Sequence, residues 1–251
     1  MTKILPLLKK YLPYILLGLG ILVFAIVGVI VVKNKNKGVD DEEEVVVELP
    51  FDKRPVVSLT PSADGHWLKL KVEKIDKTAN MLDYELLYSL PDGRTQGVPG
   101  SVTLNGRDMF ERDLLMGSES SGKFRYDEGV KNGTITIRLR DKKGKLMGKV
   151  GGGFSLFNSA DGTTLTTETG DFSVTLASFP KNSHLVLMES FGVNKAPGFK
   201  STETPFGLFA SGDVGISEYT VKGVASYVYK NNWVTDKDLS GSRFFFIASS
   251  E

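Results

Sequence analysis

The sequence predicts an all-β protein in which one transmembrane helix is followed by two β-sandwich modules. Three observations carry this fold class: an uncharged apolar run near the N-terminus, short strand-like runs separated by turn residues after residue 53, and almost no helical apolar spacing there. We therefore divide the chain into a tail (1–10), an anchor (11–32), a charged linker (33–52), a β-sandwich module (53–157) and a second β-rich module (158–251).

Residues 11–32 predict a retained membrane anchor. They form a run of 22 residues without a charged side chain, which spans roughly 33 Å as a helix against a hydrocarbon core of about 30 Å. A cleaved signal peptide would have a shorter apolar run and a small-residue cleavage site, whereas here Lys33, Lys35 and Lys37 follow. The membrane is therefore an expected partner of residues 11–32.

The orientation of this anchor follows from its short tail. Three lysines lie on each side of the apolar run, so the positive-inside rule does not discriminate between orientations. A tail of only ten residues suits a signal-anchor whose N-terminus stays in the cytoplasm. We therefore expect a single-pass membrane protein with an extracytoplasmic C-terminal region.

Composition excludes several classes of site. The chain has no cysteine, so it forms no disulfide framework, thiolate metal site or cysteine-linked lipid anchor. Its formal net charge is +1, which leaves no electrostatic footprint for nucleic acid, and we expect no nucleic-acid partner. The acidic run at 40–44 favours a solvated stalk, with a site for calcium or a cationic partner as the alternative.

Alternation of apolar and polar residues places the expected strands. In residues 134–140, for example, Ile135, Ile137 and Leu139 alternate with polar residues, and we expect Gly151–Gly153 to break or bulge the strand that returns. The apolar run at 244–247 is expected to be a central strand. The expected strands are 55–60, 66–75, 81–90, 98–104, 124–126, 134–140, 145–150, 171–178, 183–191, 206–210, 216–221, 224–229 and 243–248.

The strand spacing, Trp67 in an early strand and the hairpin around Lys143-Gly144 resemble the broad immunoglobulin-like or fibronectin type III-like class of extracellular modules. The resemblance covers 53–157 better than 158–251. It implies β-sandwich modules and lacks the cysteine pair of true immunoglobulin domains. It transfers no functional residue, and one larger barrel or sandwich over 53–251 is the alternative.

Two segments match part of a known binding motif, one for phosphate and one for calcium, and each lacks a residue that the motif requires. Residues 117–123 fit G-x-x-x-x-G-K, but Phe124 replaces the Ser or Thr that would reach Mg²⁺, which favours a Ser/Gly-rich loop between strands. Asp236, Asp238 and Ser240 match the opening of a calcium loop whose twelfth position is Ile247, so a strand-connecting turn is favoured over a metal site.

The two histidines, His66 and His184, belong to no zinc or nucleophile motif and are expected to be surface or strand-end residues. We predict no cofactor and no catalytic residue. Tyr227, Tyr229 and Trp233 form a candidate binding surface, since Tyr and Trp are enriched at interfaces, with ordinary sheet packing as the alternative.

These observations favour a non-enzymatic, membrane-anchored surface or envelope protein. Its β-sandwich region is expected to bind a protein, a glycan or a wall polymer, or to act as a spacer. The first alternative is an anchored envelope hydrolase, which requires a histidine or carboxylate cluster in a cleft. The second is an accessory subunit of a membrane complex that uses the anchor helix as its contact.

Overall fold

The computed structural model describes residues 48–250, and its regular elements there are strands and one short 3-10 turn, η1 (Phe51–Lys53). The predicted all-β class is thereby confirmed for the described residues. No helix within 48–250 is long and apolar enough to cross a membrane. The predicted tail, the anchor (11–32) and most of the linker lie outside the described residues, so the anchor stays a prediction.

Every strand pair is antiparallel. The strands are β1 (Val56–Pro61), β2 (Trp67–Glu73), β3 (Met81–Ser89), β4 (Thr95–Thr103), β5 (Met109–Leu115), β6 (Gly117–Ser120), β7 (Lys123–Tyr126), β8 (Asn132–Arg140), β9 (Leu146–Asn158), β10 (Thr164–Thr166), β11 (Phe172–Ser178), β12 (His184–Glu189), β13 (Phe206–Val221), β14 (Ser226–Tyr229), β15 (Trp233–Val234) and β16 (Leu239–Ala248).

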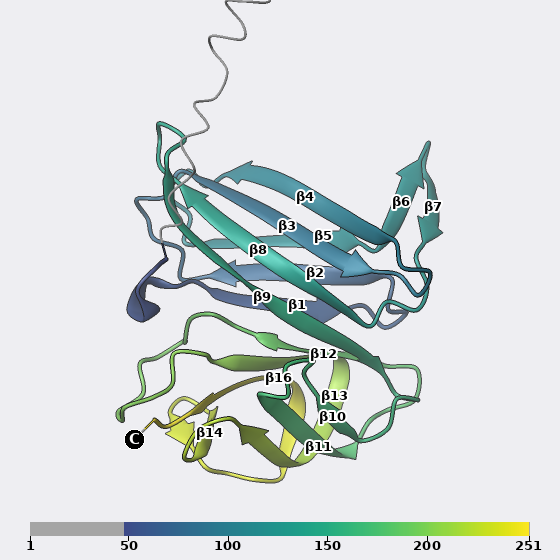
Figure 1. Cartoon of the computed structure of the whole chain (residues 1–251), viewed down its shortest axis with the longest axis vertical. Helices are drawn as coiled ribbons and strands as arrows, with labels where there is room; N and C mark the ends of the chain where they lie inside the picture. Colours follow the sequence, from purple (N-terminus) through teal and green to yellow (C-terminus); the bar gives the residue numbers. More distant parts are fainter. Residues whose placement is uncertain (1–47, 251) are drawn as a thin grey trace, which may run out of the picture. The chain divides into compact units, whose positions relative to one another are not determined.

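Three sheets organise these strands. An 11-stranded sheet follows the order β15-β14-β16-β13-β12-β9-β8-β3-β4, with β11 beside β13 and β10 beside β11. A three-stranded sheet has the order β1-β2-β5, and β6 and β7 form a separate hairpin. Figure 1 shows this hairpin projecting from the edge of the first half of the molecule.

The first half is a layered structure with one apolar core. Side chains from β2, β3 and β8 alternate between buried and exposed, so each strand offers one apolar face. The apolar faces of the two sheets meet in a single cluster. Its fully buried members include Leu68, Leu70, Leu82, Leu86 and Ile137.

The second half has its own aromatic core. Phe172 lies 5.2 Å from Phe206 and 4.9 Å from Phe246, measured between ring centroids. Strand β16, which carries Phe244 and Phe246, lies between β13 and β14. The central position predicted for residues 244–247 is therefore confirmed.

The expectation that Gly151–Gly153 would interrupt a strand is wrong. β9 continues through all three glycines, which stay in register with β8, and Figure 1 shows it running from the first half into the second. A Cβ on Gly152 would lie 3.0 Å from both a carboxylate oxygen of Glu189 and the ring of Phe191. The glycine therefore permits close approach of neighbouring side chains instead of breaking the strand.

The separate strands expected at 206–210 and 216–221 are likewise one strand, β13. The register of β13 against β16 shifts between Phe209 and Val214, so the polar residues between them form a bulge within one long strand. The sequence predicts no strand at β5, β6, β10 or β15.

The segment that matched a phosphate-binding loop forms the β6–β7 hairpin. Its turn has Ser121 and Gly122 at φ values of 52° and 75°, and β7 follows directly. A phosphate site of this kind needs a helix N-terminus after the loop. The predicted Ser/Gly-rich loop between strands is therefore limited to the turn at Ser121 and Gly122, and the loop prediction is wrong for residues 117–120, which form β6.

The predicted module boundary between residues 157 and 158 falls at the end of β9. Two apolar clusters lie largely on either side of it, yet β9 pairs with β8 before it and with β12 up to it. Val186, Met188, Phe209 and Phe245 from the second half belong to the first cluster. The division into modules 53–157 and 158–251 therefore stays a prediction, since the sheet runs across it.

Candidate functional site

The predicted aromatic surface is partly used for packing. Tyr229 and Trp233 lie 5.2 Å apart between ring centroids and pack against the first core cluster, and the Trp233 Nε1–H donates to the Lys195 carbonyl at 2.7 Å. Tyr227 stacks on Phe199 at 4.2 Å. These rings are half-buried, and the Trp233 Nε1–H already has a hydrogen-bond acceptor within the chain. Both observations favour a packing role for the three aromatic residues.

The partial calcium motif spans a turn and the start of a strand. The Lys230 ammonium donates to Asp236 at 3.1 Å, Asp238 adopts a φ of 57°, and Ser240 pairs with Gly215 inside the sheet. Among residues 48–250 no group of three or more histidine or carboxylate side chains could hold a metal ion. The calcium interpretation of Asp236, Asp238 and Ser240 gains no supporting observation.

The structure brings His66 and His184 to one small pocket of about 140 Å³, which sequence spacing did not indicate. Each is at a strand end, as predicted: His66 precedes β2 and His184 begins β12. Nδ1 of His66 lies 3.4 Å from an Asp64 carboxylate oxygen, and Nε2 of His66 lies 3.5 Å from a Glu128 carboxylate oxygen. Nδ1 of His184 lies 3.1 Å from the Ala63 carbonyl oxygen.

The side chains around this pocket already serve the local fold. Asp64 accepts hydrogen bonds from Ser62 and from the His66 backbone N–H, and these hold the pKa of its carboxyl below the usual range. Asp127 accepts a hydrogen bond from the buried Tyr88 hydroxyl at 2.8 Å. These hydrogen bonds stabilise the β1–β2 turn and its surroundings, so a structural role explains the pocket better than a catalytic one does.

An open groove of about 500 Å³ lies beside that turn, on the face of β1 and β2 that carries Trp67. The turn fixes the position of Trp67, because the Trp67 N–H donates to Ser62 Oγ at 3.0 Å and the Ser62 N–H donates to the Trp67 carbonyl at 2.9 Å. We call this cavity the Trp67 groove; its lining residues are Thr60, Pro61, Ser62, Trp67, Lys69 and Asp113.

Three polar groups of the Trp67 groove have no partner within residues 48–250. Neither Nε1 of Trp67 nor the ammonium of Lys69 nor the carboxylate of Asp113 makes a hydrogen bond or ion pair to a described residue. Lys69 and Asp113 stand directly opposite each other on β2 and β5, and both are exposed. The groove thus offers a wall of apolar surface with unused donors and an unused acceptor.

An aromatic row continues the groove onto the β6–β7 hairpin. Phe124 packs edge-on against Trp67 at 5.6 Å between ring centroids and lies parallel to Tyr126 at 6.2 Å. His66 covers a face of Tyr126 at 4.0 Å. Phe124 remains 45% exposed and Tyr126 36% exposed, although both are large apolar side chains. Exposed aromatic rings beside a groove make this surface the candidate binding site of the described residues.

Sequence reasoning missed this site because its parts lie far apart in the chain. The sequence indicates Trp67 only as an early-strand residue, and Phe124 and Tyr126 only as part of a short strand. The signal that was available is the alternation of Phe124 and Tyr126 with Lys123 and Arg125, which puts both rings on one face of a strand. Nothing in the spacing places that face beside Trp67.

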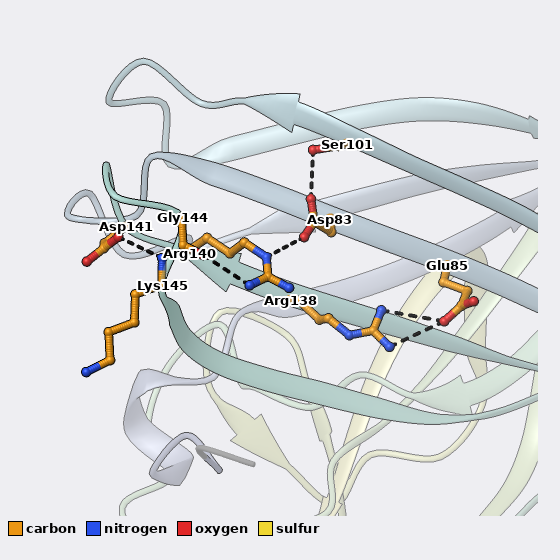
Figure 2. Close-up of polar contacts among 8 residues, drawn as sticks. All are labelled: Asp83, Glu85, Ser101, Arg138, Arg140, Asp141, Gly144 and Lys145. Atoms are coloured by element: carbon orange, nitrogen blue, oxygen red, sulfur yellow. Dashed lines mark hydrogen bonds and ion pairs between the residues drawn. The ribbon is translucent and has the colours of Figure 1, made fainter. Parts of the chain in front are cut away.

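The outer face of β3 and β8, by contrast, carries charges that satisfy one another. Figure 2 shows Arg140 donating to Asp83, which also accepts from Ser101, and Arg138 reaching Glu85. Both arginines are committed to carboxylates on the neighbouring strand. This face is therefore a stabilising ladder of ion pairs and offers a ligand less than the Trp67 groove does.

Comparison with known proteins leaves the site to be interpreted from its geometry. No protein-family model matches the chain, and no curated protein matches it.

Proposed function

We propose that this chain is a membrane-anchored, non-catalytic binding protein whose Trp67 groove and adjoining aromatic row hold a ligand on the extracytoplasmic side. The observation that carries the proposal is the groove itself, in which Trp67, Lys69 and Asp113 keep unused hydrogen-bonding groups beside apolar surface. The apolar run at residues 11–32 supplies the anchor, and the part of the charged linker before residue 48 holds the β region away from the membrane, because Leu49 already packs against the β core.

The experiment is capture of envelope material by the purified full chain, held in a detergent without a sugar headgroup. A variant carrying Phe124→Ala and Lys69→Met alters two exposed side chains at the groove and its aromatic row and should retain the fold. We expect the unaltered chain to retain envelope material and this double variant to lose most of it. The matched control, Tyr227→Ala, should bind normally.

The reverse pattern would overturn the site assignment. If Tyr227→Ala abolished capture while the groove variant bound, the aromatic group at 227–233 would be the binding surface. Absence of capture by every form would remove the binding function and leave a spacer role.

A second candidate is an anchored hydrolase, which the pocket containing His66, His184, Asp64 and Glu128 favours. Both ring nitrogens of His66 already face carboxylates, and Nδ1 of His184 faces a backbone carbonyl, so only Nε2 of His184 remains for a substrate. Turnover of envelope material that is lost in both His66→Ala and His184→Ala, and kept in the groove variant, would favour this candidate over binding.

A further inference from the structure

We infer that the ligand of the Trp67 groove is a neutral glycan chain, an inference that rests on the binding function proposed above. Three properties of the site lead to this class of ligand: the ring geometry of the aromatic row, the chemistry of its unused polar groups, and its balance of charge.

The aromatic row places rings of different orientation next to one another, with Phe124 edge-on to Trp67 and parallel to Tyr126. Phe124 lies between Trp67 on one side and Tyr126 on the other, at centroid distances of 5.6 and 6.2 Å. His66, the chain neighbour of Trp67, covers one face of Tyr126 at 4.0 Å between ring centroids. A pyranose ring has C–H faces that pack on aromatic rings, so successive sugar units can occupy the groove and then the exposed Phe124.

The unused polar groups suit hydroxyls. The Trp67 Nε1–H and the Lys69 ammonium donate hydrogen bonds, the Asp113 carboxylate accepts them, and the Thr60 hydroxyl does both. A sugar hydroxyl also both donates and accepts, so it satisfies any of these groups. A purely apolar ligand would leave these donors and the acceptor desolvated without partners, at a cost in affinity.

Charge balance disfavours strongly charged polymers. Lys69 and Asp113 stand opposite each other in register, so the groove presents one positive and one negative group at the same level. A polyanion would meet Asp113 and a polycation would meet Lys69. A neutral chain bonds to both without repulsion.

A polypeptide is the less suitable occupant because its backbone would find no backbone partner. Extended peptides usually bind by adding a strand to a sheet edge. The groove is lined by side chains from β1, β2 and β5. The edge strand β5 carries the charged residues Glu111, Arg112 and Asp113, which oppose strand addition.

The two tryptophans of the chain allow a direct measurement at the site. In a full chain carrying Trp233→Phe, Trp67 is the only tryptophan, so its fluorescence reports on the groove. The matched control carries Trp67→Phe and retains Trp233. The titrants are cellohexaose, chitohexaose and the chain's own envelope fraction, the last of these intact, protease-treated or oxidised with periodate, which destroys vicinal diols.

We expect a saturable Trp67 response to the envelope fraction that survives protease and is lost after periodate, with no response in the Trp67→Phe control. Asp113→Asn and Phe124→Ala should each weaken the response about tenfold. A neutral oligosaccharide that reproduces the response would identify the sugar class directly.

Two other outcomes would overturn the inference in distinguishable ways. A response that survives periodate and is lost after protease would mean a protein ligand, which rejects the glycan while the proposed binding function stands. No Trp67 response to any envelope fraction would reject both the glycan and the Trp67 groove as the binding site.

Discussion

At the scale of single residues, hydrogen bonds outweigh burial at Asp83. Burial alone would raise the pKa of this carboxyl, but hydrogen bonds from Ser101 at 2.7 Å and from Arg140 at 2.7 Å hold the pKa below its usual range. The charged form is therefore favoured more in the folded chain than in the unfolded chain. Figure 2 shows that both donors come from strands on either side of β3.

Because the pKa of Asp83 is lower in the folded chain than in the unfolded chain, its contribution to the free energy of unfolding depends on pH. A lowered folded pKa stabilises the fold above the unfolded pKa of about 4, and that stability is lost as pH falls through the folded pKa. We expect Asp83→Asn to reduce the free energy of unfolding by about 1–2 kcal/mol at neutral pH, because it removes a charge-assisted bond to Arg140. The difference should shrink steadily below about pH 4. Urea denaturation at several pH values measures it.

Asp92→Asn is the matched control for Asp83→Asn. The pKa of Asp92 is also lowered, but by hydrogen bonds from Arg94 within a single exposed turn. Its substitution should therefore change stability less than that of Asp83. Equal effects of the two substitutions would show that the bonds between strands at Asp83 add nothing beyond a surface charge.

At the scale of elements, β9 links the two halves through its glycines. Gly152 lies against Glu189 and Phe191, whereas the nearest atom to a Cβ on Gly153 would be 3.8 Å away. Burial, reinforced by the charge of Asp171, raises the pKa of the Glu189 carboxyl, in accord with its half-buried position beneath this strand. An added methyl group would therefore be crowded at Gly152 and would have room at Gly153.

The expected effects of alanine at these two positions therefore differ. Gly152→Ala should lower the free energy of unfolding by about 1–3 kcal/mol, because two packed side chains must shift. Gly153→Ala should be neutral or stabilising by about 0.5 kcal/mol, since it reduces the entropy of the unfolded chain. Thermal and urea unfolding of both variants gives the comparison. Similar losses at both positions would mean that strand geometry, and not the approach of Glu189 and Phe191, selects glycine.

The elements also show what local sequence predicts and what it does not. Alternation predicted β3 and β8 to within a few residues, because each buries one face and exposes the other. It failed for β5, where Glu111, Arg112 and Asp113 are exposed in succession on an edge strand. It also could not distinguish a strand break from a close approach at Gly152, because that depends on Glu189, which is distant in the sequence.

At the scale of the whole molecule, the candidate site is a product of the tertiary fold. The Trp67 groove draws Thr60 from β1, Lys69 from β2 and Asp113 from β5, and the aromatic row adds Phe124 from a hairpin. Pairing of β2 with β5 brings Lys69 and Asp113 together although they are far apart in the chain. No motif in the sequence contains such a set.

The placement of this site outside the cell membrane is the last prediction, and the absence of cysteine makes it measurable. Ser118→Cys adds the only thiol of the chain at an exposed position in β6, and Thr2→Cys does so in the N-terminal tail. Both variants are treated with a membrane-impermeant maleimide in intact cells, in cells with a permeabilised outer membrane where one exists, and after lysis. We expect the thiol of the Ser118→Cys variant to be labelled before lysis and that of the Thr2→Cys variant only after it.

The reverse labelling pattern would mean that the β region faces the cytoplasm, where envelope glycans are absent, so it would overturn the extracytoplasmic site and its proposed ligand together. Release of the chain from membranes by an alkaline carbonate wash would instead overturn the anchor at residues 11–32. Because Ser118 lies on the same hairpin as Phe124, labelling there reports on the compartment of the aromatic row itself.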